Sequence, residues 1–184
     1  MRVERLAIPE IMLIVPRRYA DARGHFCETF SVGGFAEIGI EGRFAQDNQS
    51  LSRAKGTLRG LHCQVAPHVQ GKLVRVLRGA AWDVAVDARA GAPSYGQWVG
   101  ATLTAEGGEQ LWVPPGFLHG FVTLMPETEI LYKVTGVYDR AAERGVIWND
   151  AALGIRWPIA GEPILSDKDQ HLPPFAAAQG WFAV

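Results

Sequence analysis

The chain has 184 residues, of which 48% are hydrophobic and 20% are charged, and its formal net charge is −1. So small a net charge provides no field that attracts nucleic acid or an anionic membrane surface, and we expect neither as a partner. The 21 glycines and 11 prolines favour a chain with many turns, which is typical of all-β proteins rather than helical bundles. We expect a single domain over residues 1–184, with a core large enough to be stable alone.

The cysteines and the first apolar run bear on the cellular compartment. Cys27 and Cys63 are the only cysteines, which is too few for a disulfide framework. The apolar run at residues 11–15 lies between Glu10 and Pro16 and does not have the form of a targeting signal. No apolar run approaches membrane-spanning length. We therefore expect a cytoplasmic protein with reduced thiols.

The first part of the chain reads as short strands separated by turns. The predicted elements are one or two helical turns over residues 33–40, and strands over residues 5–15 (interrupted at Pro9), 25–30 and 44–52. In the last of these strands Gln46, Asn48 and Ser50 share a parity. An otherwise ordinary strand therefore has one amide-rich face.

The next stretch, residues 58–87, combines strand-like alternation with groups that can transfer protons. Strands are predicted over residues 58–64, 72–77 and 82–87, with turns between them. In the first strand, one face is expected to carry Leu58, Gly60, His62 and Gln64, and the other Arg59, Leu61 and Cys63. Three short strands thus place a histidine, a lysine and carboxylates on the walls of one sheet.

The alternation in the second and third of these strands predicts where Lys72 and Asp83 point. Lys72 shares its parity with Val74 and Val76, which indicates an inward position for its side chain. Asp83 lies on the face opposite the apolar Trp82.

The rest of the chain continues in the same manner. Strands are predicted over residues 97–103, 110–113, 119–124 and 130–138, and a short extended segment over 146–150. The same stretch is expected to contain a helical turn within 139–145, a charged turn at 166–170, and a short helix followed by a strand over 175–184. Roughly ten strands at short intervals predict an all-β fold, a jelly roll (an antiparallel β-sandwich or barrel) with a few short helices.

Two histidines raise the question of a metal site. A cupin metal site needs a His-x-His pair, a Glu and a later His. Here the pair reads His62 and Gln64, and the later histidine is His119, in a segment shaped like the second cupin motif. Two histidines without a third strong ligand make a poor site for zinc or iron. We therefore predict no catalytic metal.

His62 is the strongest candidate for chemistry, although a lone histidine in a strand is more often structural. Gly60 allows a ligand to approach closely, and Lys72 adds positive charge nearby. A carboxylate is needed to hold the imidazole in one tautomer, and either Asp83 or Asp169 can supply it.

Two tyrosines each keep two interpretations. Tyr132 fits a core aromatic with a hydrogen-bonded hydroxyl or a functional residue, and Tyr138 fits a surface aromatic or a functional residue.

Eleven segments occur in an order that resembles a known family. They are RGHFCE, FAQDNQS, RGLHCQ, GKLVRVLRG, WDVAVD, PSYGQWVG, QLWVPPGFLHGF, LYKVTGVY, ERGVIWND, LGIRWP and LSDKD. Together they span nearly the whole chain and resemble the dTDP-4-dehydrorhamnose 3,5-epimerases. The resemblance implies a cupin-type jelly roll that works without a metal or an organic cofactor. It also implies a dTDP-linked 4-keto-6-deoxy sugar as substrate.

The resemblance implies roles for four catalytic residues. His62 matches the family's base, Asp169 its orienting carboxylate, and Tyr132 the acid that delivers a proton to the opposite face of the sugar. Lys72 matches the residue that stabilises the enolate oxygen.

The resemblance also implies a set of binding residues and a partner. The positions that match the family's contacts to diphosphate or sugar are Arg23, Arg59 and His119, and those in its nucleotide-binding segments are Glu28, Gln46, Asp47 and Asn48. The aromatic side chains that would stack on the base are those of Tyr138 and Phe26. Two further positions match binding residues of the family, Glu143 and Lys168. In the family the N-terminal strands join a neighbouring subunit. We therefore expect a homodimer with exchanged N-terminal strands, in which residues 23–28 cross the interface. Cys63 stands where the family commonly has an aromatic, and we expect a difference in packing only.

Two alternatives remain open at this point. One is a relative that epimerises only C3 or C5 of a dTDP-4-keto-6-deoxy sugar in another deoxysugar pathway. The other is a non-catalytic or metal-binding cupin.

Overall fold

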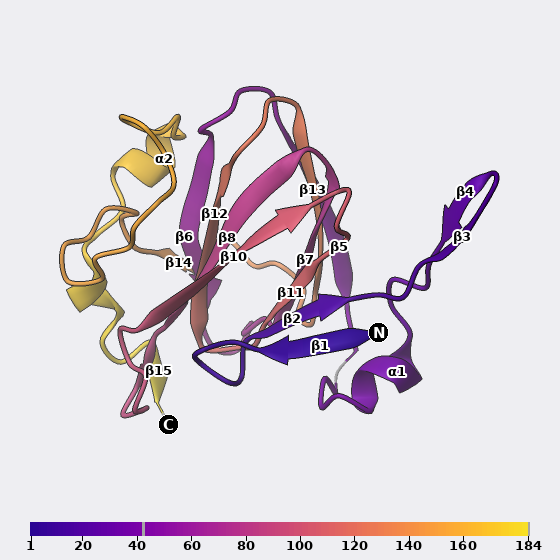
Figure 1. The fold of residues 1–184 in the computed structure, drawn as a ribbon. Coiled ribbons are helices and arrows are strands. Elements are labelled where there is room, and N and C mark those ends of the chain that lie inside the picture. Colours follow the sequence, from indigo (N-terminus) through magenta and orange to yellow (C-terminus); the bar gives the residue numbers. More distant parts are fainter. Residues whose placement is uncertain (42, 184) are drawn as a thin grey trace.

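Two antiparallel sheets face each other in a computed structural model that describes residues 1–41 and 43–183 (Figure 1). The six-stranded sheet has the order β1 (Arg2–Arg5), β2 (Met12–Val15), β11 (Gln110–Val113), β7 (Lys72–Arg78), β13 (Thr128–Val134) and β5 (Gln46–Ser52). The five-stranded sheet has the order β10 (Trp98–Thr104), β8 (Ala80–Asp87), β12 (Phe117–Thr123), β6 (Leu58–Gln64) and β14 (Glu143–Gly145). The predicted all-β jelly roll is confirmed.

The main core lies between these two sheets. Alternate residues of β7, β8 and β10 to β13 point into it, for example Val74 and Val76 from β7, Ala85 from β8 and Ile130 from β13, all of which are buried. This interdigitation is what the period of two in each strand predicts. The inward parity of β7 also carries Lys72, so the predicted inward position of that side chain is confirmed.

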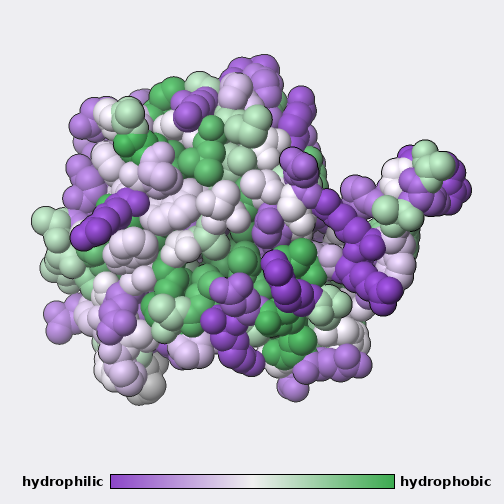
Figure 2. Space-filling view, in the orientation of Figure 1, coloured by the Kyte–Doolittle hydropathy of each residue, from purple (hydrophilic) through white to green (hydrophobic). Residues whose placement is uncertain are grey.

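The N-terminal segment covers one outer face and then leaves the body. Helix α1 (Val32–Ala36) buries Phe35 against Met12, Leu73 and Trp112 on the outside of the six-stranded sheet. Between β2 and α1, strands β3 (Tyr19–Asp21) and β4 (Gly24–Phe26) pair only with each other. This hairpin projects away from the sandwich and is surrounded by open space in the space-filling view (Figures 1 and 2).

The C-terminal segment covers the outer face of the five-stranded sheet. It contains α2 (Asp167–Gln170), a single 3₁₀ turn (Phe175–Ala178) and β15 (Phe182–Ala183), which pairs in parallel with β9 (Arg89–Ala90). Beneath it lies a second apolar cluster that includes Cys63, Val84 and Leu118. No helix among the described residues is long and apolar enough to cross a membrane.

Several predicted elements have different limits in the structure. The strand predicted over 25–30 ends at Phe26, and the one predicted over 130–138 ends at Val134. No helical turn forms within 139–145; residues 143–145 are instead strand β14, because they pair with the edge of β6. Residues 146–150 form no strand. The predicted short helix and strand of the tail are present up to residue 183, and Val184 lies outside the described residues.

A slip of one residue in the pairing of β6 with β12 changes the faces of the central strand. His62 pairs with His119, but Arg59 pairs with Phe121, so three steps along β6 oppose two along β12. The extra residue reverses the parity beyond it. Arg59 therefore lines the same cavity as His62, and the prediction that it points the other way was wrong.

Gly60 makes this slip possible. It has φ of +125°, and a Cβ there would lie 2.6 Å from the Gly120 Cα and 2.8 Å from the His119 carbonyl oxygen. Both the positive φ and the close backbone approach require glycine.

We predict that Gly60→Ala lowers the free energy of unfolding by roughly 3 kcal/mol or more, because it adds a backbone clash to an unfavourable φ. Urea denaturation measures this loss. Gly161→Ala is the matched control, since Gly161 has φ of +81° and, apart from Gly161 and its two chain neighbours, no described residue lies within 4 Å of the place that its added methyl group would take. Equal losses in the two variants would contradict the proposed packing constraint.

Candidate active site

A cavity opens between the two sheets, and its two adjoining parts share His62, Lys72 and Tyr132. The first part, of about 260 Å³, is also lined by Ser50, Arg59, His119, Phe121, Ser166, Lys168 and Asp169. The second part, of about 210 Å³, is also lined by Gln46, Asn48, Cys63, Gln64, Gln70, Tyr138 and Glu143. The three shared side chains therefore stand where the two parts meet.

His62 forms a hydrogen-bonded pair with Asp169. Its Nε2 lies 2.7 Å from Oδ1 of Asp169, whose second oxygen accepts the Gly60 backbone N–H at 3.3 Å. Burial alone would raise the pKa of the Asp169 carboxyl, but these hydrogen bonds outweigh it and lower that pKa. An ionised carboxylate can only accept, so Nε2 carries the proton and Nδ1 keeps a free lone pair. The imidazole is thereby held in a tautomer suited to a base.

A second imidazole–carboxylate pair stands beside the first. His119 Nε2 lies 2.8 Å from Oδ1 of Asp83, and both side chains are buried. Burial lowers the pKa of His119, which favours the neutral imidazole. Asp83 is thus committed to His119, and Asp169 is the carboxylate that orients His62.

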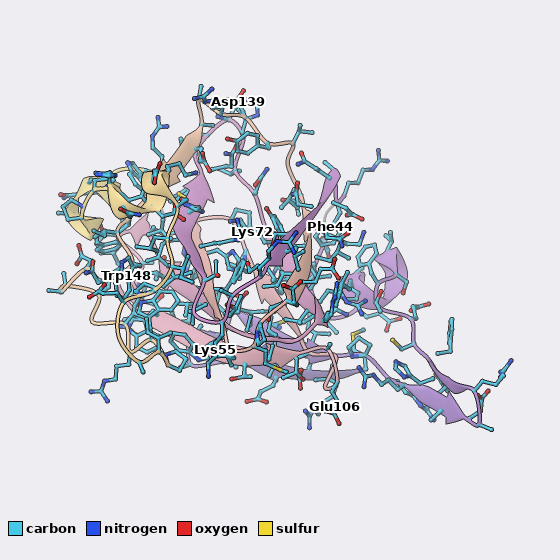
Figure 3. The ribbon with its side chains drawn as sticks, turned by 90° about the horizontal axis from the view of Figure 1, so that it is seen from above. Phe44, Lys55, Lys72, Glu106, Asp139 and Trp148 are labelled. Atoms are coloured by element: carbon cyan, nitrogen blue, oxygen red, sulfur yellow. The ribbon has the colours of Figure 1, made fainter. Side chains whose placement is uncertain are left out.

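Lys72 is a buried cation on the wall opposite His62. Its side chain comes from β7, is 9% exposed, and its Nζ donates to the His62 carbonyl oxygen at 3.3 Å. Figure 3 shows it pointing into the space between the sheets. Burial lowers its pKa, so the ammonium group has lost much of its hydration and interacts strongly with any developing negative charge.

Tyr132 reaches the cavity from the sheet opposite His62. It lies on β13, where its Cα pairs with those of Asn48 and Val74. Burial raises the pKa of its hydroxyl, so the phenol is protonated at neutral pH. An imidazole and a phenol therefore enter one cavity from opposite sheets.

The rim of the second part of the cavity is a polar network. Glu143 accepts from Lys168 Nζ at 2.8 Å and from the Tyr138 hydroxyl at 3.2 Å. Burial would raise the pKa of Glu143, but the contact with Lys168 outweighs it and lowers that pKa. The ion pair also ties α2 to β14.

Four predicted site residues do not reach this cavity within one chain. Arg23 and Phe26 lie on the projecting hairpin, where Arg23 pairs with Asp21 at 2.6 Å and Phe26 is 71% exposed. Glu28 follows that hairpin and accepts from the Ser31 hydroxyl. Asp47 lies on the outer face of β5, opposite to the face that carries Gln46 and Asn48, and its carboxylate forms an ion pair with Lys133.

Some cavity residues were not named as site residues from the sequence. They are Ser50, Cys63, Gln64, Gln70, Phe121 and Ser166. Ser50 and Phe121 could have been found, because they share the parity of Asn48 and His119 respectively. The Ser50 Oγ is buried without a hydrogen-bond partner among the described residues.

The side chains around the cavity do not form a cluster of metal ligands. Among residues 1–41 and 43–183, no three His, Cys, Asp or Glu side chains are grouped as a metal site requires.

Comparison with known proteins gives a consistent family. The family model described as dTDP-4-dehydrorhamnose 3,5-epimerase matches residues 5–177. The dTDP-4-dehydrorhamnose 3,5-epimerase of Sinorhizobium fredii is 50% identical, over 94% of this chain and 89% of the relative.

Solved structures agree with this match. A crystal structure of dTDP-6-deoxy-D-glucose-3,5-epimerase from Legionella pneumophila in complex with dTDP-4-keto-L-rhamnose has a TM-score of 0.91 at 43% identity, covering 95% of this chain and 93% of that one. The RmlC epimerase of Mycobacterium tuberculosis has a TM-score of 0.94 at 32% identity, and the match covers 100% of this chain and 94% of that one.

The lowered pKa of Asp169 predicts a pH dependence of stability. Its folded-state pKa lies below the unfolded value of about 3.9, so its contribution is present above that value and is lost as the pH falls through the folded-state pKa. Asp169→Asn removes this contribution. The difference in free energy of unfolding between wild type and Asp169→Asn should therefore narrow as the pH falls from about 6 to about 3, measured by urea denaturation. A difference that stays constant over this range would contradict the assignment.

Proposed function

The chain belongs to the dTDP-4-dehydrorhamnose 3,5-epimerase family, and we propose that it uses His62 and Tyr132 as base and acid in this epimerisation. The enzyme is an isomerase that converts dTDP-4-dehydro-6-deoxy-D-glucose to dTDP-4-dehydro-L-rhamnose, which feeds dTDP-rhamnose synthesis. The observation that carries the proposal is that His62 and Tyr132 enter one cavity from opposite sheets with Lys72 at its wall.

The chemistry requires three groups around a keto sugar. The C4 ketone acidifies the C–H bonds at C3 and C5, so a base can remove either proton while the electron pair moves to the carbonyl oxygen as an enolate. Inversion then requires a proton from the opposite face. No electron is gained or lost overall, so a base, an acid and a cation near the oxygen are sufficient.

His62 is suited to the first step. Its Nδ1 lone pair is free because Nε2–H is held by Asp169. The imidazolium that forms on proton removal is stabilised by the same carboxylate, which lies 2.7 Å away and is buried. Asp169 therefore acts as the orienting carboxylate rather than as the base.

Tyr132 and Lys72 are suited to the remaining steps. Tyr132 is protonated at neutral pH because burial raises its pKa, so it can donate a proton to the enolate carbon. Lys72 offers a buried ammonium group to the enolate oxygen, where low local dielectric strengthens the attraction. Solvent then restores the protonation states of His62 and Tyr132.

The second part of the cavity is suited to the nucleotide. Asn48 and Gln46 provide amide groups, and Tyr138 provides an aromatic face that is 47% exposed. Arg59 lines the first part, where a guanidinium suits phosphate oxygens. His119 also lines it, and because its Nε2 faces Asp83, its Nδ1 is left to accept from a sugar hydroxyl.

The projecting hairpin supports a homodimer as part of this proposal. Arg23 and Phe26 lie outside the cavity of their own chain, on an arm that pairs with no other strand among the described residues. Tyr19 and Phe26 are 55% and 71% exposed on this arm, and such apolar exposure is typical of an interface. We propose that the arm joins a partner subunit and adds Arg23, Phe26 and Glu28 to the partner's cavity.

We predict that His62→Asn lowers kcat by about 10²–10⁴-fold, because the base is lost. Deuterium uptake from deuterated water at C3 and C5 of the sugar, followed by NMR, should fall in parallel. Tyr132→Phe should lose inversion more than exchange, since His62 can return a deuteron to the face from which it took the proton.

Tyr95→Phe is the control for these variants, because Tyr95 packs against Phe175 away from the cavity. Exchange at only one carbon by the wild type would instead indicate a single-carbon epimerase. Unchanged exchange in His62→Asn would overturn the role of His62.

We predict that two inactive variants restore activity when they share a dimer. In a mixed dimer of Arg23→Glu and His62→Asn chains, one cavity has an intact His62 and receives an intact Arg23 from its partner. Random pairing after co-expression should give about a quarter of wild-type activity. Activity no higher than that of the separate variants would show that Arg23 does not act across subunits.

A further inference from the structure

Gln64, a buried glutamine at the end of β6, forms hydrogen bonds to the backbone of Asp139, in the loop between β13 and β14. Gln64 is 5% exposed. Its Oε1 accepts the backbone N–H of Asp139 at 2.9 Å, and its Nε2 donates to the carbonyl oxygen of the same residue at 3.0 Å. One side-chain amide therefore satisfies both backbone polar groups of a single loop residue.

The clamped residue lies between two side chains of the cavity rim. Asp139 follows Tyr138 directly and precedes Glu143, where β14 begins. The Asp139 carboxylate in turn accepts two backbone N–H groups of the next turn, at 2.7 and 3.1 Å. Figure 3 shows Asp139 at the edge of the molecule, on the loop that leaves the sandwich. The position of Asp139 therefore governs both ends of the rim.

This loop has little apolar burial to hold it. Val137 and Tyr138 are 60% and 47% exposed, and the next buried side chain is that of Ala142. Its conformation consequently depends on hydrogen bonds. Besides the Gln64 clamp these include Tyr138 N–H to Gln46 Oε1 at 3.1 Å and Gln70 Nε2 to the Gly136 carbonyl oxygen.

We propose that Gln64 is a positioning residue that fixes the Tyr138 ring and the Glu143 carboxylate relative to each other. It acts through the Asp139 backbone, since both its amide oxygen and its amide nitrogen are engaged there. This inference rests on the proposed function, in which the nucleotide binds in the second part of the cavity, which Tyr138 and Glu143 line. Gln64 therefore controls substrate affinity rather than proton transfer.

Gln64→Leu tests this, because it removes both hydrogen bonds and keeps a similar volume. KM for the dTDP-sugar, and Kd for dTDP measured by calorimetry, should rise about ten- to thirty-fold, while kcat falls less than about threefold. Gln64→Glu keeps the acceptor for the Asp139 N–H and loses the donor to the Asp139 carbonyl oxygen. Its Kd for dTDP should therefore lie between that of the wild type and that of Gln64→Leu.

A double-mutant cycle with Tyr138→Ala separates positioning from a general structural effect. If Gln64 acts by placing Tyr138, then Gln64→Leu should raise Kd by much less in the Tyr138→Ala background than in wild type. Gln49→Leu is the matched control, since Gln49 is an exposed glutamine on the outer face of β5 whose side chain donates a hydrogen bond to Glu129 of β13. Thermal unfolding of each variant verifies that it is folded, and Gln64→Glu replaces Gln64→Leu in the cycle if the latter does not fold.

An unchanged Kd for dTDP in Gln64→Leu, or full additivity in the cycle, would overturn the inference. A wild-type protein that binds dTDP but exchanges no deuterium into the sugar would overturn the proposed function instead. The role proposed for Gln64 would still be tested in that case, because the Kd for dTDP does not depend on turnover of the sugar.

Discussion

The hydrogen bond between His62 and Asp169 joins the sandwich to the segment that covers it. The two residues are 107 positions apart in the chain, and the bond brings helix α2 against the end of β6. Ser166 caps that helix by accepting the Asp169 N–H, so the carboxylate is held from both directions. The same helix carries Lys168, whose ion pair with Glu143 draws in β14. One pairing thus orients the His62 imidazole and closes the wall of the cavity around it.

Burial also shifts the pKa values of three further cavity groups. It lowers the pKa values of Lys72 and His119 and raises that of Tyr132, so each is shifted toward its neutral form. This environment suits the proposed epimerisation, because a neutral phenol can donate its proton and a poorly hydrated ammonium group attracts a developing enolate strongly. At Cys63, which lines the second part of the cavity and packs into the second apolar cluster, burial raises the pKa of the thiol to about 12 and so keeps it protonated.

Amide side chains provide the second organising principle of the site. Metal-binding cupins place a histidine two residues after the first one, and this chain has Gln64 there. Its amide is directed at the backbone of Asp139 and stabilises the loop that carries Tyr138. Gln46 also stabilises this loop, because its Oε1 accepts the Tyr138 N–H while its Nε2 donates to Asn48 Oδ1. Residues whose types suggest ligand binding are thus also part of the scaffold that shapes the rim.

Local patterns in the sequence determined most strands and the inward face of β7, because side chains alternate with a period of two wherever the ladder is regular. They could not determine that Arg59 joins His62, since that depends on the slip of β6 against β12 at Gly60. Nor could they choose between Asp83 and Asp169 as the partner of His62. That choice depends on which strand or helix packs beside the imidazole, and only the tertiary structure, by bringing distant segments together, decided it.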